Sequence, residues 1–444
     1  MTRGFGRAAA LLLVLTLAGC DWFSSIFDES SGKKPLPGDR LSVLGLERRL
    51  EPDPALADAE IRLPDAVLNA DWPQAGGRSN HAMQHVQLDG TLHQQWTTSV
   101  GDGASRYGEP LSQPIVAGGR VFAMDSQDVV VAIDAATGHR VWENDLEPEA
   151  AKDHAFGGGL AVAGDRVFVT TGYGQILALE VATGHQIWRQ QVASPMRGAP
   201  TVADNRVFAI TVENRLEVLS AEDGHRLWTH SGLPETAGLV GAASPAVEGD
   251  IVVVPYSSGE IFALRVENGR PLWSDNLATA RPLGALSTLA DIRGRPVIDR
   301  GRVFAVSHSG RMVAIDLRSG ERVWEQEIGG THEPWVAGDY VYVLGNDVDL
   351  FCLMRQDGRV RWVHELPRYE DEKKKKDPIQ WAGPILAGDR LIVVGSNGDG
   401  FSLSPYDGKP LGHTSFSDPV YIEPVVAGDT LYVLTDDADL VALR

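Results

Sequence analysis

The sequence predicts an all-β protein: an eight-bladed β-propeller of four-stranded antiparallel blades, with a strand from the N-terminal side closing the last blade. Two repeated patterns and the way the chain ends support this prediction. The first pattern is an apolar strand, a polar turn closed by glycine, and a second strand whose tryptophan stands four residues after the glycine. Regular internal repetition of this kind is typical of repeat folds. The six pairs are Gly138/Trp142, Gly184/Trp188, Gly224/Trp228, Gly269/Trp273, Gly320/Trp324 and Gly358/Trp362.

The second pattern resembles Ala-Gly-Asp-Arg-Val-Phe and occurs eight times. Its copies begin 38 to 51 residues apart, close to the roughly 40–50 residues of a four-stranded propeller blade. The runs between turns are short and rich in Val, Ile, Phe and Tyr, which favours strands over paired helices. The copies begin at Ala117, Ala163, Ala203, Glu248, Asp299, Ala337, Ala387 and Ala427.

The residues of the first pattern have local physical reasons. A turn between antiparallel strands often needs a positive φ, which glycine adopts without a Cβ clash. Asp134 and Thr137 can hold such a turn closed through side-chain oxygens. We expect each tryptophan to pack between its own blade and the next, because a buried indole removes about 150–250 Å² from water.

The two ends of the chain predict how the ring closes. The seventh glycine turn, at Gly408, has Gly412 where a tryptophan is expected, and the eighth copy stops at Leu443 before any final strand. The stretch His93–Val100 contains Trp96 and matches the missing strand. Closure of this kind removes exposed strand edges. The propeller is predicted over residues 71–444.

The first twenty residues predict a secreted lipoprotein. Residues 1–19 have two arginines, an apolar run and small residues before a cleavage point, as in a signal peptide. Leu17-Ala18-Gly19-Cys20 matches a bacterial lipobox, which predicts lipidation of Cys20; an ordinary signal peptide with a chance cysteine is the alternative. A lipidated N-terminus anchors a domain to a membrane without a spanning helix. Residues 20–70 are predicted to be the lipidated N-terminus and a flexible tether.

Charge and cysteine content narrow the class of protein. The formal net charge is −20, which disfavours nucleic acid as a partner. Only Cys20 and Cys352 are present, so lipidation of Cys20 leaves no intrachain disulfide. Lys373–Lys376 could form a patch for an anionic partner, but flanking acids favour a solvated loop tip.

No catalytic constellation is found. The sequence lacks His-Glu-x-x-His, Gly-x-Ser-x-Gly and a phosphate-binding loop. The tryptophan motif also occurs in quinoprotein dehydrogenases, so a PQQ- and calcium-dependent oxidoreductase is the enzymatic alternative. The adjacent cysteines typical of those enzymes are absent, and the acidic stretches 346–349 and 436–439 fall where the repeat places ordinary turns. We predict a non-enzymatic protein without cofactor or metal.

Several segments together resemble one family closely. They are the Leu17–Cys20 lipobox, the eight blades, Trp96–Gly101, Leu286–Asp291, Val303–Ala305 and Ala314–Gly320. This combination is similar to the BamB lipoproteins of the β-barrel assembly machinery in Gram-negative outer membranes. The similarity covers residues 90 to 444, and the segment Leu286–Asp291 joined to the turn at Gly320 is its more specific part.

The resemblance implies a periplasmic scaffold that binds the periplasmic domains of BamA, contacts other assembly subunits and assists unfolded outer-membrane proteins. The family's contact surface uses a Leu-x-Leu-Arg stretch and an Asp-x-Asp stretch. By position these fall on residues 237–240 and 291–293, so the implied partner-binding residues are Leu239, Val240, Asp291 and Arg293. Leu239 and Asp291 match the family, whereas Val240 replaces an arginine and Arg293 an aspartate. Loop packing and turn capping are the structural alternative for Leu239 and Asp291.

The resemblance also implies the periplasmic face of the outer membrane as the location. Asp21 directly follows Cys20, and in enteric bacteria aspartate there tends to retain lipoproteins in the inner membrane. The sequence therefore does not decide between the outer and the inner membrane as the location.

Overall fold

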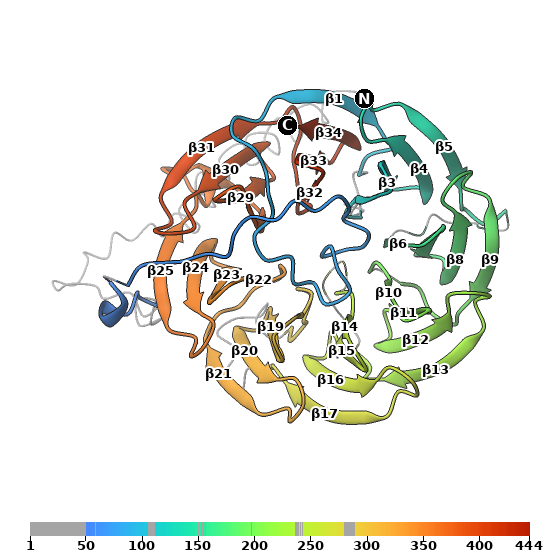
Figure 1. Ribbon diagram of the computed structural model, residues 1–444, viewed down its shortest axis with the longest axis horizontal. Helices are drawn as coiled ribbons and strands as arrows, with labels where there is room; N and C mark the ends of the chain where they lie inside the picture. Colours follow the sequence, from blue (N-terminus) through green and yellow to red (C-terminus); the bar gives the residue numbers. More distant parts are fainter. Residues whose placement is uncertain are drawn as a thin grey trace, which may run out of the picture. The chain divides into compact units, whose positions relative to one another are not determined.

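Eight four-stranded antiparallel sheets follow one another around a common axis, as Figure 1 shows for the computed structural model of the chain. The eight-bladed propeller predicted from the repeats is confirmed. The structure describes residues 50–57, 59–104, 112–149, 151, 155, 157–196, 198–235, 239, 241, 243–278 and 289–444. Among these residues, no helical segment could span a lipid bilayer.

The first four blades each take their strands consecutively from the chain, from the innermost strand to the outermost. Blade 1 contains β2 (Ile115–Ala117), β3 (Arg120–Met124), β4 (Val129–Asp134) and β5 (Arg140–Asp145). Blade 2 contains β6 (Gly158–Ala163), β7 (Arg166–Thr171), β8 (Gln175–Glu180) and β9 (Gln186–Gln191). Blade 3 contains β10 (Thr201–Ala203), β11 (Arg206–Ile210), β12 (Arg215–Ser220) and β13 (Arg226–Ser231). Blade 4 contains β14 (Ala246–Glu248), β15 (Ile251–Pro255), β16 (Glu260–Arg265) and β17 (Pro271–Asn276).

The next three blades follow the same order, and the eighth takes its outermost strand from the N-terminal side. Blade 5 contains β18 (Val297–Asp299), β19 (Arg302–Ser307), β20 (Arg311–Asp316) and β21 (Arg322–Gln326). Blade 6 contains β22 (Trp335–Ala337), β23 (Tyr340–Leu344), β24 (Asp349–Met354) and β25 (Val360–Glu365). Blade 7 contains β28 (Trp381–Ala387), β29 (Arg390–Gly395), β30 (Asp399–Leu403) and β31 (Pro410–Ser415). Blade 8 contains β32 (Val425–Ala427), β33 (Thr430–Leu434), β34 (Asp439–Leu443) and β1 (Gln94–Ser99). Outside the blades lie the hairpin of β26 (Tyr369–Asp371) and β27 (Lys376–Pro378) and the short 3₁₀ helix η2 (Pro54–Leu56).

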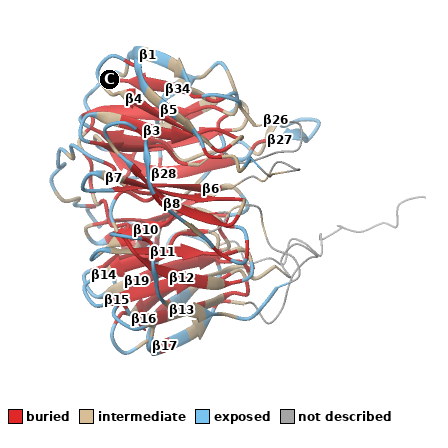
Figure 2. Cartoon of the chain, turned by 90° about the vertical axis from the view of Figure 1, so that its right-hand side faces the viewer, coloured by how far each residue is buried: buried red, intermediate tan, exposed pale blue. Residues whose placement is uncertain are grey.

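Burial within a blade follows the position of the strand. The inner and middle strands, such as β2, β3 and β4, are buried almost throughout, whereas the outermost strand β5 is mostly exposed. Figure 2 shows the resulting buried interior of the ring with exposed turns around it. The core is therefore made between neighbouring blades, and each blade depends on the next to bury its faces.

The outermost strand of each blade contains a β-bulge one residue before the tryptophan position. In blade 3, Trp228 pairs with Val218 and Arg226 with Leu219, which leaves Leu227 as the extra residue. A bulge adds twist and redirects side chains. This explains a set of exposed aliphatic residues at the same repeat position: Val141, Ile187, Leu227, Leu272, Val323 and Leu411.

Each tryptophan of the first pattern seals a junction between blades. The indole Nε1 of Trp142 donates to the Val181 carbonyl of the next blade at 2.9 Å. Its ring covers Gly184, where a Cβ would lie 2.6 Å from the indole and where φ is +74°, so this position needs glycine. The same donation to the next blade occurs at seven junctions, from Trp96, Trp142, Trp188, Trp228, Trp273, Trp324 and Trp362. The expected packing of tryptophan between blades is confirmed.

An arginine from the second pattern supports several of these junctions. Arg120 Nη1 donates at 2.6 Å to the Val181 carbonyl, which also receives the indole of Trp142. Arg166 and Arg302 make the corresponding bonds at their own junctions. A charged donor on a shared carbonyl strengthens the contact between blades.

The last blade is closed by β1 from the other end of the chain. β1 pairs antiparallel with β34, with Trp96 opposite Ala442 and Ser99 opposite Asp439. Beyond the strands, His93 and Arg444 exchange backbone hydrogen bonds of 2.8 and 2.9 Å. The predicted closure is confirmed.

Residues 69–90, here named the clasp, run once around the axis and bond to the inner strands of all eight blades (Figure 1). The clasp begins at blade 8, where Gly428 N donates to Asn69 O at 2.7 Å. The bonds to blades 1 through 8 then follow in order: Trp72 N to Val116 O 2.7 Å, Val162 N to Pro73 O 2.6 Å, Val202 N to Gln74 Oε1 2.9 Å, Val247 N to Ser79 O 2.6 Å, Ile298 N to Asn80 O 2.9 Å, Trp335 Nε1 to Gln84 O 2.7 Å, Gly388 N to Val86 O 2.9 Å, and Asp89 N to Asp429 Oδ1 2.8 Å.

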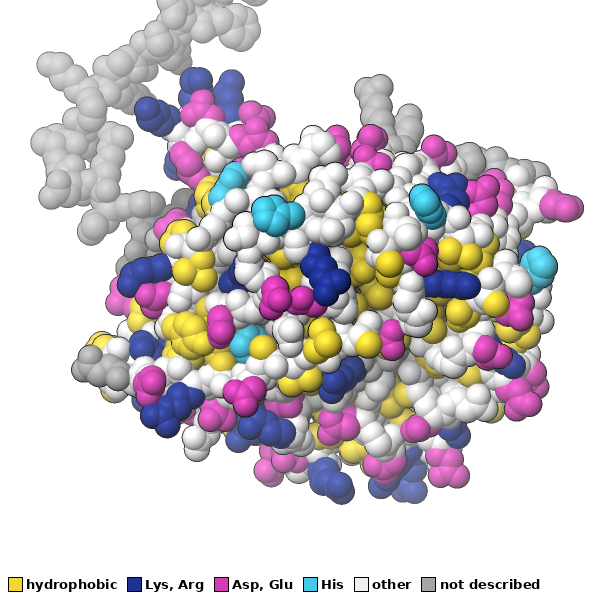
Figure 3. Space-filling model, turned by 45° about the horizontal axis from the view of Figure 1, so that its top comes forward, with side chains coloured by type: hydrophobic (Ala, Val, Ile, Leu, Met, Phe, Trp, Pro, Cys, Tyr) yellow, Lys and Arg dark blue, Asp and Glu magenta, His cyan; other side chains and the backbone are white. Residues whose placement is uncertain are grey.

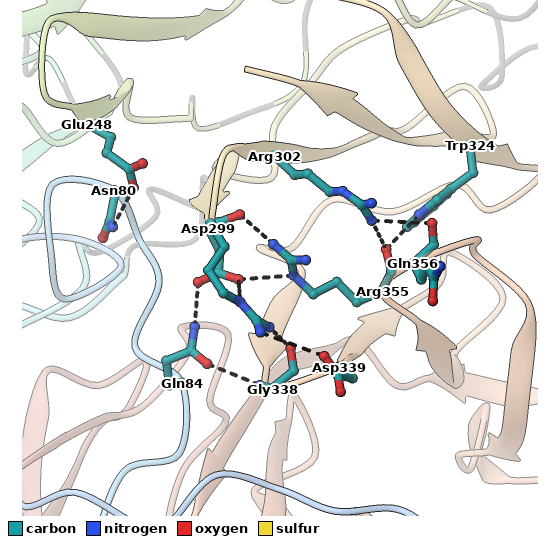
Figure 4. A network of polar contacts seen from close by, with 11 residues as sticks. Asn80, Gln84, Glu248, Asp299, Arg302, Trp324, Gly338, Asp339, Arg355 and Gln356 are labelled. Carbon is teal, nitrogen blue, oxygen red and sulfur yellow. Dashed lines mark hydrogen bonds and ion pairs between the residues drawn. The ribbon is translucent and has the colours of Figure 1, made fainter. Parts of the chain in front are cut away.

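Side chains reinforce the clasp where it passes blades 5 and 6 (Figure 4). Gln84 Nε2 donates to Asp299 Oδ1 at 2.8 Å, and Gln84 Oε1 accepts from Gly338 N at 3.1 Å. Arg355 Nε reaches the second oxygen of Asp299 at 3.1 Å. One carboxylate thus links the clasp, blade 5 and a turn of blade 6.

The segment ahead of the clasp also contacts the ring. Asp53 N donates to Val360 O of β25 at 2.8 Å, Leu56 is buried, and Val67 exchanges backbone bonds with residues 85 and 87. The part of the expected flexible tether that the structure describes, residues 50–57 and 59–70, therefore bonds to blade 6 and to the clasp. The sequence predicted a flexible linker here because the segment is held by single long-range contacts, and such contacts leave no periodic pattern in the sequence.

Candidate functional site

Two connectors on one face of the ring bring together two of the residues implied by the resemblance. Each connector joins the outermost strand of one blade to the innermost strand of the next, so all connectors lie on the same face, opposite the turns of the second pattern. Leu239 lies between β13 and β14, and Asp291 between β17 and β18. Leu239 N donates to Asp291 Oδ2 at 3.0 Å. The contact links residues 52 positions apart in the sequence.

Asp291 positions the connectors from inside the protein. Its side chain is only 4% exposed. Burial raises the pKa of its carboxyl group, and the bond from Leu239 N opposes that rise. Its backbone carbonyl accepts from His308 N at 2.9 Å. Asp291 therefore holds the loop that carries Leu239, while Leu239, which is partly exposed, is the residue of this pair that can meet a partner.

The two positions that depart from the family pattern are placed differently. Arg293 is partly buried, and a Cβ at the neighbouring Gly241 would lie 3.0 Å from its Nε. Burial lowers the pKa of Arg293, whereas the charges of Glu423 and Asp291 favour its protonated form. Val240 and the predicted lipidation site Cys20 lie outside the described residues.

A buried ion cluster spans the axis beside these connectors. Arg295 Nε contacts Glu333 Oε2 at 2.6 Å, and Arg295 Nη2 contacts Glu423. His332 Nδ1 lies 3.0 Å from the second oxygen of Glu423. These residues precede the innermost strands of blades 5, 6 and 8, so the cluster, here named the axial cluster, connects blade 8 across the axis to blades 5 and 6, which are not adjacent to it.

The clasp covers the axial cluster. Gly76 N donates to Gln113 Oε1 at 3.1 Å, and Gln113 Nε2 donates to Glu423 O at 3.1 Å. Gly76 has φ +75°, and a Cβ there would lie 2.8 Å from Glu333 Oε2. His81, 2% exposed, bonds through Nδ1 to Pro296 O at 2.7 Å, and its Nε2 has no hydrogen-bond partner among the described residues.

Glu333 and Glu423 share the guanidinium of Arg295, and the pKa values of their two carboxyl groups differ widely. Burial raises the pKa of Glu333 to about 7, although Arg295 opposes the rise. Burial acts in the same direction on Glu423, but Arg295 and His332 outweigh it and hold the pKa of Glu423 well below its usual value. Burial, with Arg295 nearby, lowers the pKa of His81 to about 3. The cluster therefore holds Arg295 charged between one ionised carboxylate and one that takes up a proton near neutrality.

The axis does not offer the residues that a quinone with calcium would need. Both axial carboxylates, Glu333 and Glu423, are engaged by Arg295, and Cys352 is a single buried thiol whose pKa burial raises. The acidic stretches 346–349 and 436–439 lie in the turns that join β23 to β24 and β33 to β34 and end on the first residue of the second strand. Among the described residues no three His, Cys, Asp or Glu side chains are grouped to hold a metal ion. The residues at the axis therefore do not fit a quinone cofactor with a calcium ion.

The clasp and the axial cluster were missed by sequence reasoning. The propeller is predicted to begin at residue 71, but nothing in the sequence that follows predicts a path around the axis. The signal that was present is the accumulation of Gly, Asn, Gln and His between residues 74 and 85. Such residues suit a buried segment without regular structure, because their side chains can satisfy backbone groups that a sheet would otherwise pair.

Comparisons with known proteins agree with this architecture. The sequence matches the family described as outer membrane protein assembly factor BamB over residues 84–153 and 126–364. A protein of that name from Alkalilimnicola ehrlichii is 38% identical over 350 residues, covering 79% of this chain and 87% of the relative. The relative of that name from Pseudomonas aeruginosa is 36% identical and covers 79% of this chain and 88% of its own length.

Solved structures share the fold. The crystal structure of BamB from Moraxella catarrhalis superposes with a TM-score of 0.67 at 20% identity, covering 80% of this chain and 100% of that protein. The quinohemoprotein alcohol dehydrogenase from Comamonas testosteroni superposes with a TM-score of 0.62 at 15% identity, covering 85% and 79%. At these identities the likeness concerns the propeller alone.

Proposed function

The chain belongs to the family of outer membrane protein assembly factor BamB, and we propose that it is a non-enzymatic scaffold lipoprotein that binds BamA and assists the folding and insertion of outer-membrane proteins. Membership in the family supports a role in outer membrane protein assembly. The finer proposal concerns the partner, the surface used and the anchor.

The observation that carries the proposal is the pairing of Leu239 with Asp291. Two connectors from successive blades are fixed to each other on a rigid ring, and loops held by a rigid scaffold are well suited to recognition. In this proposal Leu239 and Val240 contact BamA, and Asp291 positions the loop that carries them. Arg293, which lies beside Gly241, supports the same connector.

The surface charge is consistent with a protein partner. The net charge is −20, and Figure 3 shows acidic, basic and hydrophobic side chains interspersed over the face that it presents. A nucleic-acid-binding protein would present an extended basic surface. Other assembly subunits and unfolded outer-membrane proteins are the further partners in this proposal.

Co-purification tests the surface. The double variant Leu239→Ala with Asp291→Ala is expected to recover much less BamA from detergent-solubilised membranes than the unaltered lipoprotein does. Leu227→Ala with Asp223→Ala, an exposed pair on blade 3 away from the connectors, is the control and should recover a normal amount. Normal recovery with the connector variant, at an unchanged melting temperature, would refute the proposed surface.

The anchor is proposed at Cys20, after removal of residues 1–19, with residues 20–49 as the tether to the described part of the chain. Mass spectrometry of the mature protein should show an acylated N-terminal Cys20, and Cys20→Ser should release the protein from membranes. We place the chain at the periplasmic face of the outer membrane. If Asp21 retains it in the inner membrane instead, membrane fractionation will show this, and Asp21→Ser will relocate it.

A further inference from the structure

The connector between blades 6 and 7 is interrupted by the β26–β27 hairpin, which projects from the ring in Figure 2. Tyr369 pairs with Pro378 and Asp371 with Lys376, and the four residues 372–375 make the turn. The lysine run singled out in the sequence, Lys373–Lys376, therefore occupies the tip of a regular hairpin.

The base of this hairpin is fixed to the propeller. Ile379 N donates to Arg368 O at 2.9 Å, and the indole of the buried Trp381 donates to Pro367 O at 2.8 Å. Arg368 Nε lies 3.1 Å from Glu365 Oε1 on the edge of blade 6. A fixed base holds the tip in one direction, which lowers the ordering cost of binding.

Two of the four acidic residues of the hairpin, Asp371 and Glu372, have partners within it, whereas only one of its four lysines does. Glu372 Oε1 accepts from the backbone N–H groups of Arg368 and Tyr369 at 2.7 and 3.1 Å. Asp371 pairs with Lys374 Nζ at 2.9 Å. The other three lysines, Lys373, Lys375 and Lys376, are exposed and make no ion pair with any described residue.

The tip is far enough from the blades to act on its own. The protein as a whole is acidic, with a net charge of −20, so lysines lying flat on it would be surrounded by negative potential. The three residues of β26 extend about 10 Å from the base, whereas screening in physiological salt acts over about 8 Å. The lysines at the tip are thus largely screened from the acidic body and can attract an anionic partner.

The hairpin stands on the connector face, where Leu239 and Asp291 pair. That pair brings little basic charge to the surface: residue 240 is valine rather than the arginine of the family pattern, and Arg293 is partly buried near the charge of Glu423. The lysine tip is therefore a separate source of positive charge on the face proposed to bind a protein.

We propose that the β26–β27 hairpin is a second docking site on this face, and that Lys373, Lys375 and Lys376 bind an acidic surface of the periplasmic protein that the connectors grip. This inference rests on the proposed function and adds the charge of the partner. An anionic membrane fits less well, because residues 368–378 hold five basic and four acidic side chains, a net charge of only +1. A discrete acidic patch can meet the lysines alone, whereas a continuous anionic surface also meets the acids.

Binding of the full-length lipoprotein to immobilised periplasmic domains of BamA from the same bacterium tests the inference. The triple variant Lys373→Gln/Lys375→Gln/Lys376→Gln should bind about tenfold more weakly in 50 mM salt, and the difference should shrink in 500 mM salt. Replacing the same three lysines by arginine should keep the affinity. Lys409→Gln, which removes a lysine paired with Asp407 at 2.7 Å on the opposite face, should also leave it unchanged.

Three results would count against the inference, each in its own way. Equal affinity and equal salt dependence for the glutamine triple variant would overturn the hairpin site while leaving the connector surface intact. Flotation with phosphatidylglycerol vesicles that depends on these lysines, together with unchanged binding to BamA, would overturn it in favour of a lipid surface. Failure of the unaltered chain to bind BamA would overturn the proposed function, and the role of the hairpin with it.

Discussion

Seven of the eight blade junctions are built alike, and the junction between blades 7 and 8 is built differently. At each of the seven, an indole donates to a carbonyl of the next blade and covers its turn glycine, as Trp188 does with Ala221 O and Gly224. At the eighth, position 412 is glycine, and a Cβ there would meet only the Ser402 side chain at 3.9 Å. Blade 8 also lacks the turn that would receive a tryptophan, because its outermost strand is β1 from the other end of the chain.

The clasp substitutes for that missing turn. Arg390 occupies the position where Arg120 and Arg166 reach the turn of the next blade, but it donates to Gly90 O at 2.5 Å and Asp89 O at 2.8 Å. Residues 89 and 90 lead directly into β1. The comparison shows that tryptophan and turn glycine occur together at seven junctions and are both absent at the eighth. There, between blades 7 and 8, residues 89 and 90 of the clasp take the place of the turn.

The largest expected effect comes from removing β34, the strand that pairs with the closing strand β1. A chain ending at Leu434 lacks β34, so β1 loses its only neighbouring strand in the sheet. The faces of blade 8 that pack against blades 7 and 1 are then exposed to water. We expect loss of the cooperative unfolding transition, measured by circular dichroism during heating. A truncated chain that melts sharply within a few degrees of the full chain would contradict the view that blade 8 closes the ring.

The next effect separates the two kinds of junction. Trp188→Ala removes a buried indole and its bond to the next blade, and we expect a loss of about 3–5 kcal/mol in the free energy of unfolding. Gly412→Trp should change stability by less than about 0.5 kcal/mol, because blade 8 has no turn glycine against which the new indole could pack. Urea unfolding measures both. A large stabilisation by Gly412→Trp would show that the eighth junction has a tryptophan site after all.

A third prediction uses pH to examine the axial cluster beneath the clasp. The pKa of Glu333 is raised from 4.5 to about 7 in the folded protein. Its proton therefore stabilises the fold fully below about pH 4.5, and that contribution is lost as the pH rises through 7. Glu333→Gln removes this pH dependence. His81 is present in both proteins, so its contribution cancels in the comparison. The stability of the unaltered protein relative to the variant should fall by on the order of 1–3 kcal/mol between pH 5 and pH 8, measured by urea unfolding; a constant difference would contradict it.

The smallest effect concerns the seam itself. Arg390→Ala should cost about 1–2 kcal/mol and speed hydrogen exchange of the backbone at residues 86–93. Arg206 holds the same repeat position but donates at 2.9 Å to Asp204 in its own turn, so Arg206→Ala is the matched control and should change little. Equal effects of the two variants would remove the special role assigned to the clasp at this seam.

The blades could be predicted from the sequence because their determinants are local and repeated. The eight copies of the second pattern, from Ala117 to Ala427, predicted the number of blades, and the unpaired strand at Trp96 predicted the closure. The resemblance placed Leu239 and Asp291 on one contact surface, but it predicted neither the hydrogen bond between them nor the burial that makes Asp291 a positioning residue. The clasp and the axial cluster could not be predicted in this way. Arg295 meets Glu333 and Glu423 across 38 and 128 residues, and such contacts exist only once the ring has closed.

Photo-crosslinking from the two faces of the ring tests the central claim most directly. A photoreactive amino acid at Leu239 samples the connector face, and one at Ala136, in an exposed turn, samples the opposite face. In living cells we expect crosslinks to BamA from position 239 and none from position 136. Crosslinks from position 136 alone would contradict the claim that the connectors of this ring grip the assembly machinery.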